Sequence, residues 1–195
     1  MPRPSTNADT SQRILDIAER LLQTRGYNAF SYADIAQSLQ VTKASLHYHF
    51  PTKAELGKRL IERYKQSFAG ALGDIEKASA DGIERLRRYT GLYLNVLRND
   101  RMCLCGMLAA EHMTLPKPMK AELGRFFDEN ERWLVTVLEE GRATKTLRFD
   151  GTAREVAVFL VSSLEGAMML ARSYGDVARF EATADRLLAS LAVGK

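Results

Sequence analysis

Residues 31–50 read SYADIAQSLQVTKASLHYHF, and the pattern of this stretch decides the fold. Ser31, followed three residues later by Asp34, is a variant of the capping box that starts a helix. Thr42 caps a second short helix that runs to about His49. Only a few residues separate the two helices. The stretch therefore predicts a helix-turn-helix.

A helix-turn-helix places the N-terminal half of its second helix in the major groove of duplex DNA. Lys43 and the backbone N–H groups at the start of that helix offer positive character to a phosphate, and Lys53 provides a second phosphate anchor. The residues predicted to bind DNA are Ser31, Thr42, Lys43, Ser45, His47, Tyr48 and Lys53. The motif favours a sequence-specific DNA-binding regulator over an enzyme.

Helical periodicity continues on both sides of the motif. A helix with apolar residues at the i, i+3, i+4, i+7 spacing precedes it and ends at Gly26. A fourth helix begins at Thr52 and is expected to run towards Phe68, before a weakening over residues 70–73. Later helices are expected over Ile83–Leu97, Leu104–Met113, Met119–Ala143, Ala153–Arg172 and Val177–Leu191. Strand signals are almost absent.

The expected architecture is therefore all-α, with a small N-terminal helix-turn-helix DNA-binding domain followed by a helical bundle that binds a ligand and dimerises. The first domain is predicted over residues 1–60, with a connecting helix to about residue 70. The second is predicted over residues 71–195. Residues 1–70 hold all of the net charge of +4, because the lysines and arginines of the rest equal its acidic residues in number. This asymmetry is expected of a first domain that meets a polyanion.

Composition indicates an ordinary soluble globular protein, with 46% hydrophobic and 27% charged residues. No uninterrupted apolar run approaches the roughly 20 residues that span a bilayer, and residues 1–12 lack the apolar segment of a secretory signal. We therefore expect a cytoplasmic protein without a membrane partner. The two cysteines, Cys103 and Cys105, are too few and too close together for a disulfide framework.

Residues 41–56, VTKASLHYHFPTKAEL, resemble the recognition-helix signature of the TetR (tetracycline repressor)/AcrR-type family of bacterial transcriptional regulators. Residues 14–27, ILDIAERLLQTRGY, are similar to the first helix of that family and its closing Gly-Tyr. The resemblance implies that Tyr48 and Lys53 contact phosphates and that His47 occupies the position where the family varies its base-reading side chain. Ala44 departs from the usual glycine of the family. Beyond about residue 70 the resemblance implies only helices, a dimer and a ligand pocket.

Aromatic and methionine side chains in the central helices either line an effector pocket or form ordinary core. The residues predicted for such a pocket are Tyr89, Tyr93, Cys103, Met107, Glu111, His112, Phe126, Phe127, Trp133 and Met168. Cys103 and Cys105 are either small buried hydrophobes or a thiolate-based redox or electrophile sensor. The sequence leaves both pairs of alternatives open.

Signatures of enzymes are missing, among them the Walker A loop, the dinucleotide fingerprint and the H-E-x-x-H motif. His47 and His49 cannot easily share a metal ion, because residues two apart on a helix point to nearly opposite sides. We expect no metal, no cofactor and no catalytic residue. The alternative is an all-α ligand-binding or thiol-reactive enzyme that retains a helix-turn-helix.

The expected function is that of a ligand-responsive transcriptional regulator. A two-fold dimer would bind a palindromic DNA operator, and a small-molecule effector of unknown identity would release it. Activation instead of repression stays open. The homodimer is expected to form through the two C-terminal helices, whose apolar content exceeds what a monomer surface should expose. The residues that carry this expectation are Val156, Phe159, Leu160, Leu164, Ala167, Leu187, Leu188 and Leu191.

Overall fold

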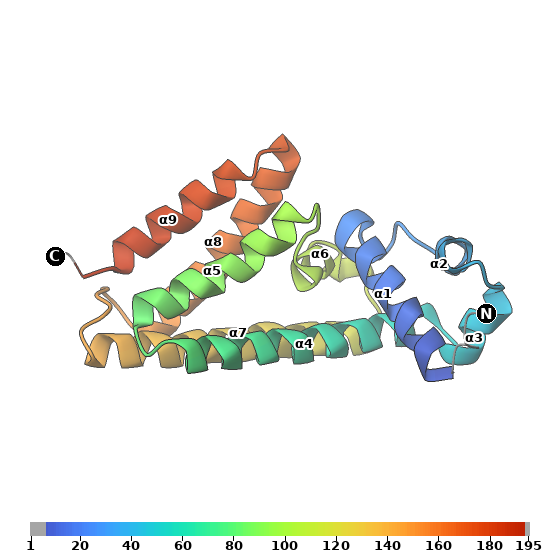
Figure 1. The fold of residues 1–195 in the computed structure, drawn as a ribbon, viewed down its shortest axis with the longest axis horizontal. Coiled ribbons are helices and arrows are strands. Elements are labelled where there is room, and N and C mark those ends of the chain that lie inside the picture. The colour runs from blue at the N-terminus through green and yellow to red at the C-terminus, as the bar shows by residue number, and fades with distance from the viewer. Residues whose placement is uncertain (1–6, 194–195) are drawn as a thin grey trace. The chain divides into compact units, whose positions relative to one another are not determined.

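The computed structural model describes residues 7–193, and this part of the chain is helical, with no strand longer than the isolated antiparallel bridge between Leu147 and Ala192 (Figure 1). The helices are α1 (Asn7–Arg25), α2 (Tyr32–Leu39), α3 (Lys43–His49), α4 (Lys53–Ala78), α5 (Gly82–Arg98), α6 (Leu104–Ala110), the 3-10 helix η1 (His112–Thr114), α7 (Lys117–Ala143), α8 (Ala153–Tyr174) and α9 (Ala178–Leu191). The all-α prediction is confirmed. The outermost residues of the two predicted domains, 1–6 and 194–195, lie outside the described range.

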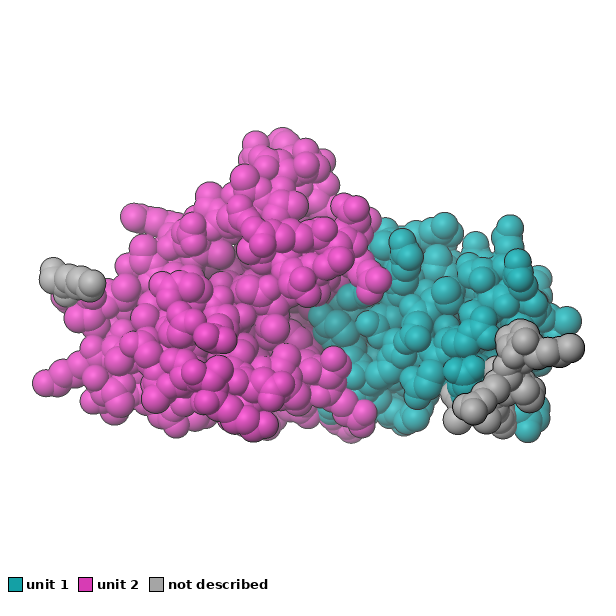
Figure 2. Space-filling model, viewed as in Figure 1, with its two compact units in different colours: residues 1–65, 104–124 teal, residues 66–103, 125–195 magenta. Residues whose placement is uncertain are grey.

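The chain divides into two compact units, which Figure 2 distinguishes by colour. Unit 1 comprises residues 1–65 and 104–124, and unit 2 comprises residues 66–103 and 125–195. Helices α4 and α7 each contribute residues to both units.

Unit 1 is built on α1, which packs against α2 and α6, while α2 packs against α3. Its centre is formed by apolar side chains that are fully buried, including Ile14, Leu22, Ile35 and Leu46. Arg63 of α4 forms ion pairs of 2.6 Å with Asp16 and with Glu19 of α1, so the start of α4 is tied to α1 by charge as well as by packing. The helix-turn-helix therefore rests on a well-packed support.

Unit 2 is a bundle in which α8 packs against α9, and α5 packs against both. Thr152 and Glu155 form a capping box at the start of α8. Gly175 ends the same helix in the left-handed conformation, with φ of 63°. Leu164 and Met168 of α8 and Phe180 of α9 are buried in the centre of this bundle.

Two predicted helix boundaries were wrong. Helix α4 does not weaken at residues 70–73 but continues to Ala78, because Leu72 and Ile75 bury an apolar face there and outweigh the poor helix propensity of glycine. The helix predicted over residues 104–113 ends at Ala110. Beyond it, Thr114 N–H bonds to the Glu111 carbonyl and Leu115 N–H to the His112 carbonyl, the tighter spacing of a 3-10 turn.

Helix α8 is long and apolar enough to cross a membrane by length and composition alone, with a mean hydropathy of 1.4 over its most apolar window. Buried core helices of soluble proteins pass the same test, and 39% of this window is buried in the structure. Five large apolar side chains of α8 are exposed to solvent. These are Val158, Phe159, Met169, Leu170 and Tyr174.

Most of the residues predicted to form the dimer are buried inside their own chain. Six of the eight predicted residues lie in the core of their own protomer and are no part of its surface: Leu160, Leu164, Ala167, Leu187, Leu188 and Leu191. Phe159 is exposed over 57% of its surface, and Val156 is half-buried. Periodicity identified α8 and α9 as apolar helices but did not separate their inner faces from their outer ones.

The continuity of α4 can be tested at Gly70, where an added Cβ atom would find no atom within 4 Å. Gly70→Ala should raise the free energy of unfolding by about 0.5–1 kcal/mol, because alanine costs less conformational entropy in a helix interior. The matched control is Gly26→Ala, which should destabilise the protein, because φ is +93° and the new Cβ would lie 2.8 Å from Oε1 of Glu111. Chemical denaturation measures both, and destabilisation by Gly70→Ala would contradict a continuous helix.

Candidate nucleic-acid interface

Helix α2 begins with the capping box that the sequence predicts. The Ser31 hydroxyl accepts the Ala33 N–H at 3.2 Å, and the Asp34 carboxylate accepts the Ser31 N–H at 2.8 Å. The hydrogen bonds from Ser31 lower the pKa of Asp34. The carboxylate is therefore ionised at neutral pH and continues to accept the hydrogen bonds of the capping box. Gln40 ends α2 in the left-handed conformation, with φ of 57°, and this turns the chain towards α3.

Helix α3 is capped by Thr42, whose hydroxyl accepts the Ser45 N–H at 3.3 Å. Leu46 is fully buried and fixes the inner face of α3 on the core of unit 1. The outer face carries Lys43, His47 and Tyr48, of which Tyr48 is 75% exposed. The helix thus presents polar and aromatic side chains to solvent from a fixed position.

His47 is oriented by two neighbours. Its Nδ1 atom lies 3.1 Å from the Pro51 carbonyl oxygen, and its ring packs on Tyr32 with centroids 4.7 Å apart. A carbonyl can only accept, so Nδ1 carries the proton and donates it. Nε2 of a neutral His47 is then an acceptor, suited to a donor on a base edge.

Tyr32 in turn fixes the far end of α3. Its hydroxyl donates to the carbonyl of Phe50 at 2.7 Å, in a buried position. Burial, with smaller effects from Tyr27 and Glu55, raises the pKa of Tyr32 to about 12, so this hydroxyl keeps its proton throughout the physiological range. The two helices of the motif are therefore joined at both ends.

Lys53 is engaged within the protein. Its ammonium donates to the carbonyl oxygen of Tyr27 at 2.5 Å and to that of Phe30, and it lies 4.5 Å and 4.4 Å from the centroids of the same two rings. Burial lowers the pKa of Lys53, against opposing contributions from Glu111 and Asp34. An ammonium has three N–H donors, so one donor remains beyond the two carbonyl contacts.

Four of the seven residues predicted to bind DNA meet at one surface hollow of about 340 Å³: Ser31, Lys43, His47 and Lys53. Phe30, Tyr32 and Ala33 complete its lining. Two cations and an imidazole beside the N-terminus of α2 suit an anionic group such as a phosphate. The structure thus brings together residues that are spread over 23 positions of the sequence.

The loop between α1 and α2 has a second anchor that the sequence did not reveal. The carboxylate of Glu111 accepts the Tyr27 N–H at 2.6 Å and the Asn28 N–H at 3.2 Å, and the Asn28 amide donates to the Thr114 hydroxyl at 2.7 Å. The sequence prediction placed Glu111 in an effector pocket. In the structure its carboxylate supports the DNA-binding motif.

The residues predicted for an effector pocket fall into both units. Met107, Glu111 and His112 belong to unit 1, and His112 is exposed. Those in unit 2 are Tyr89, Tyr93, Cys103, Phe126, Phe127, Trp133 and Met168. Cys103 and Cys105 are both buried, and neither forms a disulfide.

A closed ring of hydrogen bonds lies inside unit 2. The Tyr89 hydroxyl donates to Oδ1 of Asn130 at 2.9 Å, the Asn130 amide donates to the Tyr93 hydroxyl at 3.2 Å, and the two hydroxyls lie 3.0 Å apart. Tyr93 therefore donates back to Tyr89, and each hydroxyl gives one hydrogen bond and accepts another. Burial raises the pKa of both tyrosines far above 10, so both stay neutral.

Glu165 of α8 is a buried acid that sequence analysis missed. Its Oε1 atom is covered and has no hydrogen-bond partner, and the thiol of Cys103 donates to the carboxylate. Burial raises the pKa of Glu165 to about 7. An acidic residue inside the long, largely apolar helix α8 was the available signal, because such a residue either reaches the surface or is buried for a reason.

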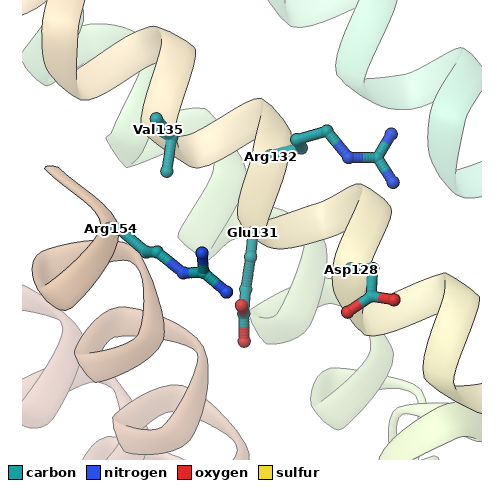
Figure 3. Close-up of a pocket in the computed structure, with 5 residues that line it drawn as sticks. All are labelled: Asp128, Glu131, Arg132, Val135 and Arg154. Atoms are coloured by element: carbon teal, nitrogen blue, oxygen red, sulfur yellow. The ribbon is translucent and has the colours of Figure 1, made fainter.

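A second hollow, of about 460 Å³, lies in unit 2 between α7 and α8 (Figure 3). Its lining consists of Asp128, Glu131, Arg132, Val135 and Arg154. Figure 3 shows the side chains of Arg154 and Glu131 directed towards each other across it. Charges of both signs balance there, so this hollow selects no ligand by charge. No group of three histidine, cysteine or acidic side chains within residues 7–193 is placed to hold a metal ion.

Comparison with known proteins identifies the fold. Residues 14–60 match the family model described as bacterial regulatory proteins, tetR family, and residues 82–187 match that of the tetracyclin repressor-like C-terminal domain. The chain belongs to the TetR family. It superposes with a TM-score of 0.94 on a TetR-family transcriptional regulator from Agrobacterium tumefaciens, at 35% identity over 96% of this chain and 100% of the other.

Two curated relatives of the chain are transcriptional regulators. The HTH-type transcriptional repressor DhaR of a Mycobacterium species is 25% identical, over 81% of this chain and 80% of its own length. The transcriptional regulator AcuR of Cereibacter sphaeroides is 28% identical, over 88% of this chain and 80% of its own length. This TetR-family chain is accordingly a DNA-binding transcriptional regulator.

The support that Glu111 gives to the loop can be measured. Glu111→Ala should lower the free energy of unfolding by about 1–3 kcal/mol, because two backbone N–H groups lose their acceptor. Glu111→Gln should cost less, since its amide oxygen can still accept one of them. Thermal and urea unfolding of both variants provide the measurement, and equal stability of Glu111→Ala and the unmodified chain would refute the anchor.

Glu165 should make stability fall with rising pH. Its pKa of about 7 in the folded chain exceeds the ordinary 4.5, so the folded state binds more protons than the unfolded state between these values. The stabilisation is complete below pH 4.5 and is lost as pH rises through 7, by about 3 kcal/mol at most. Urea titrations at pH 5 and pH 8 should show a smaller difference in Glu165→Gln, and an unchanged difference would refute the buried acid.

Proposed function

We propose that this TetR-family chain is a dimeric repressor that binds a palindromic DNA operator and is released by a small-molecule effector. Residues 1–60 would bind DNA, α4 would connect onward, and residues 71–195 would bind the effector and form the dimer. The observation that carries the proposal is the outer face of α3, which is held at both ends and presents donors and an aromatic ring to solvent. A cytoplasmic location follows from a target that is chromosomal DNA.

Roles for the individual residues follow from their exposure and contacts. Lys43 is exposed and suits a phosphate, and His47 offers Nε2 to a base edge. Tyr48 is exposed enough to reach the backbone of the duplex. Thr42 and Ser45 sit in the first turn of α3, where their hydroxyls are close to the groove in this docking mode.

Lys53 would act differently from Lys43. Two of its three donors hold the loop between α1 and α2, so its contribution to DNA binding is partly the shape of the motif itself. Lys53 lines the same hollow as Lys43 and His47, so its third donor would be available to a phosphate bound there beside both cations. Ser31 lies at the same hollow, next to the N-terminus of α2.

The dimer would form through α8 together with α9. Val158, Phe159, Met169, Leu170 and Tyr174 are exposed and fall on one side of α8 at helical spacing. An apolar face of this kind is costly in water and is typical of a subunit interface. A two-fold dimer would carry two copies of α3, and a palindromic operator would offer them two half-sites about one helical turn of DNA apart, ~34–36 Å.

Release would require that an effector binds more tightly to a form that does not fit the operator. The chain offers a short covalent route for such a coupling. Cys103, whose thiol contacts Glu165 in unit 2, directly precedes α6, and Glu111, which anchors the loop of the motif in unit 1, follows the last residue of α6. A displacement at one end of this seven-residue helix would therefore be felt at the other.

A mobility-shift titration on the DNA that flanks the gene of this chain tests the proposal. Binding should prefer a palindromic segment over unrelated duplex and should weaken steeply between 50 and 200 mM salt, because phosphate contacts release counterions. Equal affinity for all sequences, or no binding at low salt, would overturn the proposed function.

Lys43→Ala should weaken binding to specific and unrelated DNA alike. Loss of one phosphate contact should reduce the slope of log K against log salt by about 0.9, without a change in thermal stability. Lys77→Ala, which removes an equally positive and largely exposed side chain from the far part of α4, is the control and should leave the slope unchanged. If both variants behave alike, Lys43 makes no phosphate contact.

His47→Ala should change sequence preference. If Nε2 reads a base edge, the variant should lose about 1–3 kcal/mol of discrimination at one base pair of each half-site while binding to unrelated DNA persists. Competition assays with operators substituted one base pair at a time give this value. An equal loss on every sequence would assign His47 to the backbone.

A further inference from the structure

A buried carboxylate oxygen inside unit 2 has no hydrogen-bond partner. Oε1 of Glu165 is fully covered by protein and accepts no hydrogen bond, whereas the Cys103 thiol donates to the other side of the carboxylate. The side chain as a whole is half-buried, so it lies close to solvent. A buried polar atom left without a donor costs free energy, and such atoms in a native structure require an explanation.

The neighbouring polar groups cannot supply the missing donor. Tyr89 and Tyr93 lie near enough to Glu165 for their pKa values to respond to its charge. Their hydroxyl protons, however, are both used in the closed ring with Asn130. The two hydroxyl groups whose pKa values respond to Glu165 therefore have no proton to give it.

No basic side chain compensates the charge of Glu165. Within residues 7–193 no lysine, arginine or histidine forms an ion pair with it, and its pKa responds only to burial and to Cys103. The polar groups that interact with the carboxyl are thus the Cys103 thiol and two phenols, and the raised pKa values of the phenols keep both phenols neutral at physiological pH. An ionised Glu165 has no counter-charge of its own inside the protein.

Aromatic rings surround the same tyrosines. Trp133 is stacked on Tyr89, with ring centroids 5.5 Å apart and an interplanar angle of 25°. Phe68 makes edge contacts with Tyr89 at 6.3 Å, with Tyr93 at 6.2 Å and with Phe126 at 5.3 Å. The faces of such rings carry negative potential and attract cations.

We propose that Glu165 and the aromatic cluster around Tyr89 bind the effector, and that this effector is a small apolar cation with an N–H donor, such as a protonated arylalkyl amine. The inference rests on the proposed function and assigns its effector a chemical class. A protonated amine donates to the orphan oxygen, neutralises the carboxylate and places its apolar part against the rings.

The charge balance excludes the opposite class of ligand. An anion beside Glu165 would leave a net negative charge in a buried site that has no basic residue, which is strongly unfavourable. A neutral alcohol could satisfy Oε1 but would leave the charge of an ionised Glu165 uncompensated. Because burial raises the pKa of Glu165 to about 7, a cation that binds beside the carboxyl shifts it to the ionised form at neutral pH.

Three probes of nearly equal size and shape test the charge class directly: benzylamine, benzyl alcohol and benzoate. Trp133 is the single tryptophan of the chain, so its fluorescence reports binding beside Tyr89 without a label. At neutral pH, benzylamine should bind the unmodified dimer about ten- to a hundredfold more tightly than benzyl alcohol, the factor expected of a charge-assisted hydrogen bond. Benzoate should bind more weakly than either.

Glu165→Gln keeps the size of the side chain and removes its charge, so it should lower the affinity for benzylamine to about that for benzyl alcohol. Glu139→Gln is the matched control, because Glu139 is an exposed acid of α7 in the same unit, and it should leave all three affinities unchanged. Thermal unfolding confirms that both variants are folded. The comparison of the three probes on the unmodified chain needs no variant at all.

Three results would overturn the inference: benzoate binding as tightly as benzylamine, an unchanged benzylamine affinity in Glu165→Gln, or no fluorescence response to any probe at millimolar concentration. A failure of the proposed function has a different signature, namely the absence of palindrome-selective DNA binding. A chain that binds its operator but ignores benzylamine remains a repressor with an effector of another class. If the chain binds benzylamine through Glu165 but does not bind DNA, the result supports the cation site and refutes the proposed repressor function.

Discussion

The loop between α1 and α2 is held by charged groups from two directions, and the DNA-binding motif depends on that arrangement. The Lys53 ammonium donates hydrogen bonds to the carbonyl groups of Tyr27 and Phe30. The Glu111 carboxylate accepts hydrogen bonds from the N–H groups of Tyr27 and Asn28. A loop of this kind would otherwise leave its polar backbone to water. With both anchors in place, α2 starts from a fixed point, and α3 follows it through the turn at Gln40. The exposed face of α3 is therefore oriented before DNA arrives, which limits the entropy lost on binding.

What the sequence revealed were the features that local interactions determine. The capping residues Ser31 and Thr42 act on backbone groups two or three positions away, so their helices could be predicted from neighbours alone. The role of Glu111 as an anchor could not be predicted, because its hydrogen-bond partners lie 83 and 84 residues away along the chain. Lys53 was predicted as a phosphate contact from its charge, but its contacts with Tyr27 and Phe30 required the fold. Periodicity also could not tell the inner face of α8 from its outer face.

Unit 2 combines a satisfied polar group with an unsatisfied one. The ring of Tyr89, Tyr93 and Asn130 is closed, and each member supports the next, as in cooperative hydrogen-bond networks. Glu165 lies beside this ring and gains nothing from it. A protein that must respond to a ligand can hold such a group at a cost in stability, because the ligand then recovers that free energy on binding. Composition could not reveal this, since one glutamate in an apolar helix is equally consistent with a surface position.

In the proposed dimer, two copies of α3 read two half-sites of one operator. Hydroxyl-radical footprinting of the DNA that flanks the gene tests it most directly, since it maps both contacts at once. The expected result is two protected patches about 10 base pairs apart on the same face of the duplex, with two chains bound per operator. A single protected patch, or uniform weak protection along the fragment, would contradict it.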